Sequence, residues 1–184
     1  MILPILKYGN PILREKCVPV GSITPAIVQL ANDMLETTEL IGSVGLAAPQ
    51  VGHAIQMMVL DVRRSKRPST LSMRGLPAAL ESVMPLVLMN VGVRAGKGIA
   101  DEIEGCASIP GILVKIERPE PAYVTGMNLK GEQVEFECGG LLARVVQHEL
   151  DHLQGILFID RMSPEVLASV QAQVAALERG TPAI

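Results

Sequence analysis

Aromatic side chains are almost absent from this chain of 184 residues. It contains no tryptophan and only two tyrosines and two phenylalanines, although 48% of its residues are hydrophobic. A chain of this length can nevertheless bury a sizeable core within one domain. We therefore expect a single domain over residues 1–184 whose core is built from valine, leucine, isoleucine, methionine and alanine.

Cysteine and charge are also sparse. Three cysteines are an odd number, which argues against a disulfide framework and favours a reducing compartment. A net charge of −3 gives no electrostatic basis for binding nucleic acid or an anionic membrane. No apolar run reaches membrane-spanning length, and the first residues lack the pattern of a signal peptide. We expect a soluble cytoplasmic protein with no membrane partner and no specific nucleic-acid partner.

The most informative segment that is present covers residues 147–153. It reads Gln-His-Glu-Leu-Asp-His-Leu, and the apolar residues that flank it repeat at helical spacing. Residues four apart on a helix project from the same face, so the imidazoles of His148 and His152 can converge on one ion. Glu149 lies at the edge of that face, where it can take a proton from water activated by the cation. The alternative is an amphipathic helix with two incidental histidines.

A catalytic metal site needs a third ligand and an open position. No histidine follows His152, and no glutamate follows at the distance expected of thermolysin-like enzymes. We interpret His53 as a loop residue. A cysteine upstream is the remaining source of a ligand. Cys106 lies between two turns rich in glycine and proline and can face a cleft, whereas Cys17 and Cys138 look like ordinary small apolar residues.

The chain resembles peptide deformylase, because three motifs of that family occur in order. Residues 45–52 read Gly-Leu-Ala-Ala-Pro-Gln-Val-Gly, residues 104–108 read Glu-Gly-Cys-Ala-Ser, and residues 147–152 form the third motif. The likeness extends over nearly the whole chain. It implies a hydrolase that removes the formyl group from the N-terminal methionine of nascent polypeptides and releases formate.

The resemblance implies a metal centre and a base. Cys106, His148 and His152 would hold one divalent metal ion. Ferrous iron is the metal that the family is known to use in cells, and zinc, nickel and cobalt are alternative occupants. A thiolate ligand suits such borderline ions. Glu149 would act as general base and then as general acid.

The resemblance also implies contacts with the reacting group and the substrate. The side-chain amide of Gln50 and the backbone N–H of Ala107 would donate hydrogen bonds to the oxyanion that develops at the formyl carbonyl. Val44, Gly45 and Leu141 would contact the substrate. Formyl-methionyl nascent peptides are therefore the expected partners.

Three positions depart from the usual family pattern. Ser43 stands where the first motif normally begins with glycine, and Ala107 stands where leucine normally follows the ligand cysteine. Residues 111–114, Gly-Ile-Leu-Val, replace a run of aromatic, arginine and glycine. These changes alter the expected pocket walls, so a deformylase of a small N-formylated metabolite is an alternative. A non-catalytic metal-bound binding protein is another, although intact Glu149 and Gln50 argue against it.

Patterning along the chain predicts the α+β class. A threonine and a proline open a helix that ends near Gly42, a second helix carries the histidines, and Ser163 caps a third. Strands are expected at residues 56–62 and 86–90, with a hairpin of residues 122–127 and 133–137. We expect mostly antiparallel sheets around a central metal-ligand helix, with a C-terminal helix.

Two features leave alternatives open. Residues 63–85 are long for a connection and begin with a basic run, which predicts a solvated loop or a transient contact with ribosomal RNA. Arg144 could pair with Glu104 or extend its head into solvent. Asp151 could orient a ligating imidazole or form a surface ion pair.

Overall fold

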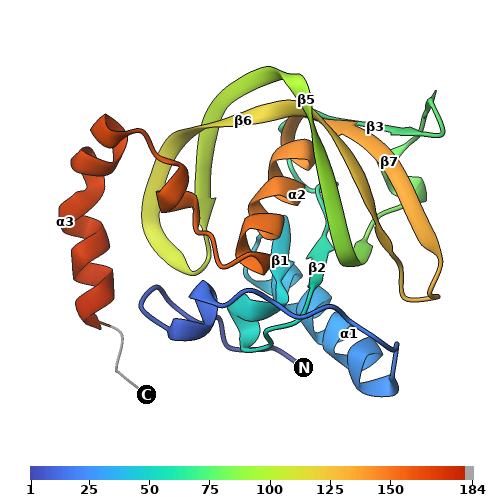
Figure 1. Cartoon of the computed structure of the whole chain (residues 1–184), viewed down its shortest axis with the longest axis horizontal. Coiled ribbons are helices and arrows are strands. Elements are labelled where there is room, and N and C mark those ends of the chain that lie inside the picture. Colours follow the sequence, from blue (N-terminus) through green and yellow to red (C-terminus); the bar gives the residue numbers. More distant parts are fainter. Residues whose placement is uncertain (181–184) are drawn as a thin grey trace.

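The fold is built around helix α2 (Gly140–Leu153), which contacts strands β1, β2, β3, β5, β6 and β7. Figure 1 shows this arrangement in the computed structural model, which describes residues 1–180. Residues 181–184 of the expected domain lie outside the described residues. The predicted α+β class, with antiparallel strands around the ligand helix and a C-terminal helix, is confirmed.

Within residues 1–180, one sheet contains all seven strands in the order β1-β2-β5-β6-β7-β3-β4, and each neighbouring pair is antiparallel. The strands are β1 (Gly45–Ala47), β2 (Met57–Leu60), β3 (Ser69–Met73), β4 (Leu76–Pro77), β5 (Leu86–Cys106), β6 (Ile109–Met127) and β7 (Gln133–Gly139). The strand expected at residues 86–90 and both arms of the predicted hairpin lie within these elements, whereas the strand expected at residues 56–62 is shorter and covers only residues 57–60.

Two expectations about the strands are corrected by the structure. β5 continues from the expected strand at 86–90 to residue 106, and its partner β6 is equally extended. The expected loop at 63–85 contains β3 and β4. Much of the β5–β6 hairpin and both residues of β4 are exposed, and β3 buries only Leu71, so neither segment carries the alternating apolar pattern by which a half-buried strand is recognised.

Helix α1 (Pro25–Leu40) begins as its sequence predicts. The Thr24 side chain accepts a hydrogen bond from the Ile27 N–H at 3.4 Å, and proline occupies the first helical position. The helix ends just before Gly42, which has a φ of 67°. Leu30 and Met34 are buried against the apolar face of β2.

Helix α2 is buried on most of its circumference. Eleven of its fourteen residues are buried, including charged ones, so its polar side chains need partners inside the protein. Leu142, Val146 and Leu153 fill the main core. Burial of each such side chain stabilises the fold by about 1.5–3 kcal/mol. The helix thus holds its histidines in a fixed position.

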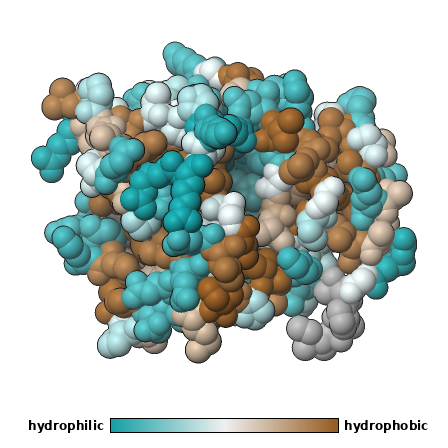
Figure 2. Space-filling view, turned by 180° about the vertical axis from the view of Figure 1, so that it is seen from behind, coloured by the Kyte–Doolittle hydropathy of each residue, from teal (hydrophilic) through white to brown (hydrophobic). Residues whose placement is uncertain are grey.

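Helix α3 (Pro164–Gly180) stands at the outer side of β6 (Figure 1) and packs there through Val170, Val174 and Leu177. Apolar side chains reach the rear surface in several separate places (Figure 2). Within residues 1–180, no helix has the length and hydropathy needed to cross a membrane.

Candidate metal centre

The structure brings Cys106, His148 and His152 together. One ligand atom from each residue lies within 4.8 Å of the others, and Cys106 Sγ is 3.2 Å from His152 Nε2. The two histidines are one helical turn apart on α2, with ring centroids separated by 5.0 Å. Ligand atoms on a tetrahedral ion lie roughly 3.5 Å apart, so this sulfur and nitrogen set fits a divalent metal.

The position of Cys106 follows from a tight turn. Cys106 ends β5 and pairs with Ile109 at the start of β6, so only two residues connect the strands. Burial would raise the pKa of its thiol, but the adjacent His152 and His148 lower that pKa well below the ordinary value. The thiolate is the form of cysteine that binds metals.

The other two cysteines lie outside this group. Cys17 and Cys138 are buried in the core, and burial raises the pKa of the first thiol to about 11 and of the second to about 12. Both therefore stay protonated at neutral pH and behave as small apolar residues.

Glu104 orients His148. Its Oε1 lies 2.6 Å from His148 Nδ1, so the opposite ring nitrogen is directed toward Cys106. Arg118 donates to both oxygens of Glu104, at 2.6 and 2.8 Å, and Arg144 donates to one of them at 2.9 Å. Burial would raise the pKa of Glu104, but the hydrogen bonds from Arg118 and His148 hold it well below its usual range. This carboxylate therefore remains ionised beside the candidate metal ligands.

Arg144 adopts the first of its two predicted roles, because its head pairs with Glu104 inside the protein. Asp151 follows neither prediction. It is 7% exposed and accepts from Arg118 at 2.9 Å and from Arg161 at 2.6 and 3.1 Å. The Glu104–Asp151 cluster (Glu104, Arg118, Arg144, Asp151 and Arg161) thus joins β5, β6 and α2 to the turn that follows the helix.

Glu149 lies next to the three candidate ligands, and among the described residues one of its carboxylate oxygens makes no hydrogen bond. The residue is 4% exposed, and within residues 1–180 its Oε2 has no hydrogen-bond partner. Burial raises the pKa of this carboxyl group. A buried carboxylate with a raised pKa and an open oxygen is suited to accept and release a proton.

Gln50 has a fixed orientation. Its Oε1 accepts from the Ala47 N–H at 2.8 Å, and its Nε2 donates to Ser108 Oγ at 3.2 Å and points to Cys106 Sγ at 3.6 Å. The donor end of the amide therefore faces the ligand group. Ala107 follows Cys106 directly, and its carbonyl accepts from Lys7 Nζ at 2.9 Å. The sequence had assigned no contact to Ser108, although it lies in the second motif, or to Lys7.

A cavity of 230 Å³ opens beside these groups. It is lined by every predicted site residue except His152, namely Val44, Gly45, Gln50, Cys106, Ala107, Leu141, His148 and Glu149. Ser43 and Leu113 also line it, and Ser43 Oγ donates to the Gly45 carbonyl at 2.8 Å. Arg67 lines it too, although the sequence had suggested only a solvated loop or a contact with ribosomal RNA there. A larger hollow of 460 Å³ over the outer strands contains none of the predicted site residues.

Comparison with known proteins gives a consistent result. Residues 2–167 match the family model described as polypeptide deformylase. The chain is 41% identical over 180 residues to a peptide deformylase of Methylacidiphilum infernorum, covering 98% of this chain and 95% of that protein. The crystal structure of peptide deformylase from Thermus thermophilus is 33% identical, with a TM-score of 0.82, and the match covers 98% of this chain and all of that one. Arabidopsis thaliana peptide deformylase 1B with an inhibitor gives 32% identity and a TM-score of 0.82, covering 97% and 91%.

Proposed function

The chain belongs to the polypeptide deformylase family and removes the N-formyl group from nascent polypeptides, and we propose that the cavity beside Cys106 is its active site. The observation that carries the proposal is the convergence of three ligand atoms within 4.8 Å at a cavity that Glu149 also lines. We further propose that residues 1–184 form one catalytic domain.

We propose that Cys106, His148 and His152 hold the single divalent metal. Such an ion polarises the formyl carbonyl and makes water more acidic. One thiolate and two imidazoles suit borderline ions, and ferrous iron is the ion that we propose, with zinc, nickel or cobalt as replacements. Glu104 supports this arrangement because its contact with His148 Nδ1 leaves Nε2 as the ring nitrogen that is available to a metal.

Protein groups carry out the proton transfers and stabilise the negative charge that develops on the formyl oxygen. Glu149 accepts a proton from the water whose oxygen bonds to the formyl carbon, and it then returns the proton to the amine nitrogen as the C–N bond breaks. The products are formate and a peptide with a free amino terminus. Gln50 Nε2 and the Ala107 N–H donate to the formyl oxygen as it gains negative charge. Removal of one such donor commonly costs a hundredfold or more in turnover.

The substrate contacts are proposed from the lining of the cavity. Val44, Gly45 and Leu141 form its walls, as the resemblance implies. Ala107 replaces the larger leucine of relatives and leaves room beside the reacting carbonyl. We propose formyl-methionyl nascent polypeptides as the substrates because the family relationship extends over almost the whole chain.

We propose that the protein acts in the cytoplasm and contacts the ribosome transiently. Arg63, Arg64 and Arg67 pair with Asp61, Glu39 and Glu102 respectively, so much of the charge in the basic segment is balanced within the protein. Binding of this segment to the anionic ribosome is therefore expected to be weak, and its affinity should decrease further as the salt concentration rises. Co-sedimentation with ribosomes at low and at physiological salt measures this contact.

Formate release tests the function directly. Protein purified without oxygen should release formate from formyl-Met-Ala-Ser, and the metal measured in the same sample should approach one ion per chain. Loss of activity after exposure to air, with recovery on addition of ferrous iron, would support iron over zinc. Metal-loaded protein that released no formate would contradict the proposal.

A further inference from the structure

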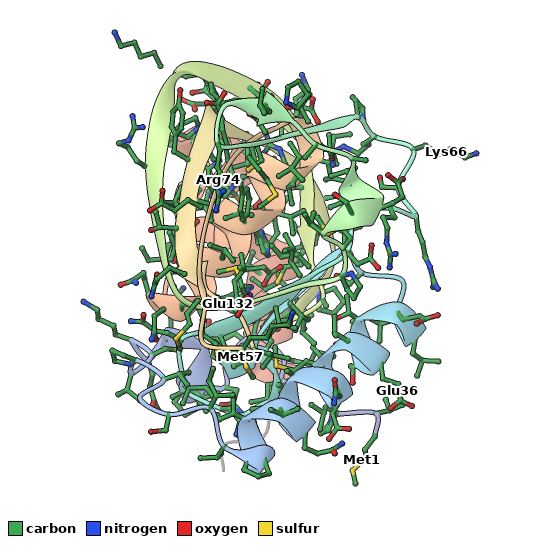
Figure 3. All side chains as sticks on the ribbon, turned by 90° about the vertical axis from the view of Figure 1, so that its right-hand side faces the viewer. Met1, Glu36, Met57, Lys66, Arg74 and Glu132 are labelled. Atoms are coloured by element: carbon green, nitrogen blue, oxygen red, sulfur yellow. The ribbon has the colours of Figure 1, made fainter. Side chains whose placement is uncertain are left out.

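Arg67 turns toward the active-site cavity, unlike its neighbour in the basic segment. Lys66 projects away from the body of the molecule (Figure 3), whereas Arg67 lines the cavity. Arg63 and Arg64 make ion pairs with residues that do not line the cavity. The segment between β2 and β3 thus contributes one guanidinium group to the entrance.

Two contacts hold that guanidinium in place. Arg67 Nη1 donates to the Ile103 carbonyl at 3.1 Å, and Nη2 pairs with the Glu102 carboxylate. A guanidinium has five N–H donors, so three stay available for a further acceptor. The Arg67 side chain is 38% exposed, which leaves these donors within reach of a ligand.

The anchor lies a defined distance from the metal ligands. Ile103 precedes Cys106 by three residues in β5, and a strand advances about 3.3 Å per residue, so the anchor is about 10 Å from the ligand cysteine. An extended peptide whose formyl group lies at Cys106 covers that distance in about three residues. Arg67 is therefore level with the second or third residue of a bound peptide.

The size and lining of the cavity agree with this placement. Its volume of 230 Å³ is below the roughly 300–1,000 Å³ of sites that enclose a drug-sized ligand. Only the first residue of a peptide can be enclosed, and the following residues must cross the rim. The rim presents the exposed apolar side chains of Ile103 and Leu113, and Arg67 places hydrogen-bond donors beside them.

We propose that Arg67 is a specificity-determining residue that donates to a main-chain carbonyl of the second or third residue of the substrate. The inference rests on the deformylase function and adds to it a preference for polypeptides over formyl-methionine. Formyl-methionine is too short to reach Arg67 and gains nothing from it. A charge-assisted hydrogen bond of this kind changes affinity by roughly tenfold or more.

Kinetics on two substrates test the proposal. Wild type, Arg67→Ala and Arg67→Gln would be compared on formyl-Met-Ala-Ser with an amidated C-terminus and on formyl-methionine. Both variants should raise KM for the amidated tripeptide roughly tenfold and leave its kcat within about twofold. Kinetics on formyl-methionine should stay unchanged. Binding of the product Met-Ala-Ser amide, followed by calorimetry, should weaken by the same factor.

Arg64→Ala is the matched control, because it removes an arginine from the same segment that pairs with Glu39 outside the cavity. Arg64→Ala should leave KM and kcat for both substrates unchanged. Equal losses on both substrates in Arg67→Ala would show that Arg67 only maintains the entrance, and no loss on the tripeptide would show that it does not touch the substrate. Formyl-Met-Ala-Ser with a free C-terminus is measured alongside, and a loss confined to that substrate would assign Arg67 to the terminal carboxylate instead. Wild type without activity on either substrate would contradict the deformylase function itself.

Discussion

The main chain at Gly45 lies directly against Glu149. A β-carbon placed on residue 45 would be 2.7 Å from Glu149 Oε1 and 2.6 Å from Val145 Cγ1. Both distances are too short for real atoms, so any other residue at this position must displace the proposed base. The absence of a side chain at Gly45 therefore leaves room for Glu149 in its observed position as well as for the substrate.

Gly45→Ala should lower turnover by about a hundredfold, because a shift of about 1 Å in a reacting group has that effect. Metal content should stay unchanged, since no proposed ligand is touched. Gly21→Ala is the control, because a β-carbon there would meet no atom within 4 Å. Steady-state rates and metal analysis on both variants check the prediction, and full activity in Gly45→Ala would contradict it.

Glu149→Gln should retain the metal and lose about a hundredfold or more in turnover. The amide preserves the size of the side chain but cannot accept the proton from water. Single-turnover formate release with parallel metal analysis separates loss of chemistry from loss of the ion. Near wild-type activity would mean that another group is the base.

Cys106→Ala should lose most of the bound metal, because only two of the three proposed ligands remain. The thermal midpoint should fall toward that of chelator-treated wild type, since metal binding is linked to folding. Cys17→Ala removes a buried thiol outside the ligand group and should keep its metal. One tightly bound ion per chain in Cys106→Ala would refute the ligand assignment.

Alkylation should distinguish the three thiols at pH 8. Burial raises the pKa of Cys17 to about 11 and of Cys138 to about 12, so both carry almost no thiolate, whereas the pKa of Cys106 is lowered. Iodoacetamide should therefore label chelator-treated protein once, at Cys106, and nickel-loaded protein should resist labelling. Peptide mass spectrometry locates the label, and modification of Cys17 before Cys106 would overturn the order of reactivity.

Ala107→Leu should raise kcat/KM on formyl-methionyl peptides by roughly tenfold, because the larger side chain restores apolar contact in a cavity that Ala107 lines. Metal content should not change. If the enzyme is adapted to a smaller formyl compound, activity on that compound should fall in the same variant. An unchanged rate on both would show that the Ala107 side chain does not face the substrate.

The sequence predicted the parts of the fold that carry local signals. Helix α1 has a capping threonine, a proline at its first position and a glycine after its end, and α2 has an apolar repeat around its histidines. The exposed parts of β5 and β6 have no such signal. They pair with each other across a two-residue turn and leave most of their side chains exposed, so these strands were recognised only where one face is buried.

In the candidate site, too, the residues with a local sequence signal were predicted and those that depend on tertiary contacts were mostly not. His148 and Glu149 were found because their spacing on one helix is visible in the sequence. The contact between Glu104 and His148 joins residues 44 positions apart, and Arg118 meets Glu104 across the hairpin. Such pairings depend on tertiary structure, and only the pairing of Glu104 with Arg144 had been considered. Arg67 was missed because nothing in a basic run shows which member turns inward.

The Glu104–Asp151 cluster also bears on how this protein can change over evolutionary time. Removing one member of a buried ion cluster leaves another charge uncompensated and costs about 3–5 kcal/mol, whereas replacing all members with apolar residues can be nearly neutral. Substitutions at Glu104, Arg118 and Asp151 should therefore be strongly non-additive. A lineage could lose these charges together but hardly one at a time, and His148 would then need a new partner. We expect the residues of the cluster to be substituted together, whereas the exposed residues of α3 can be substituted independently.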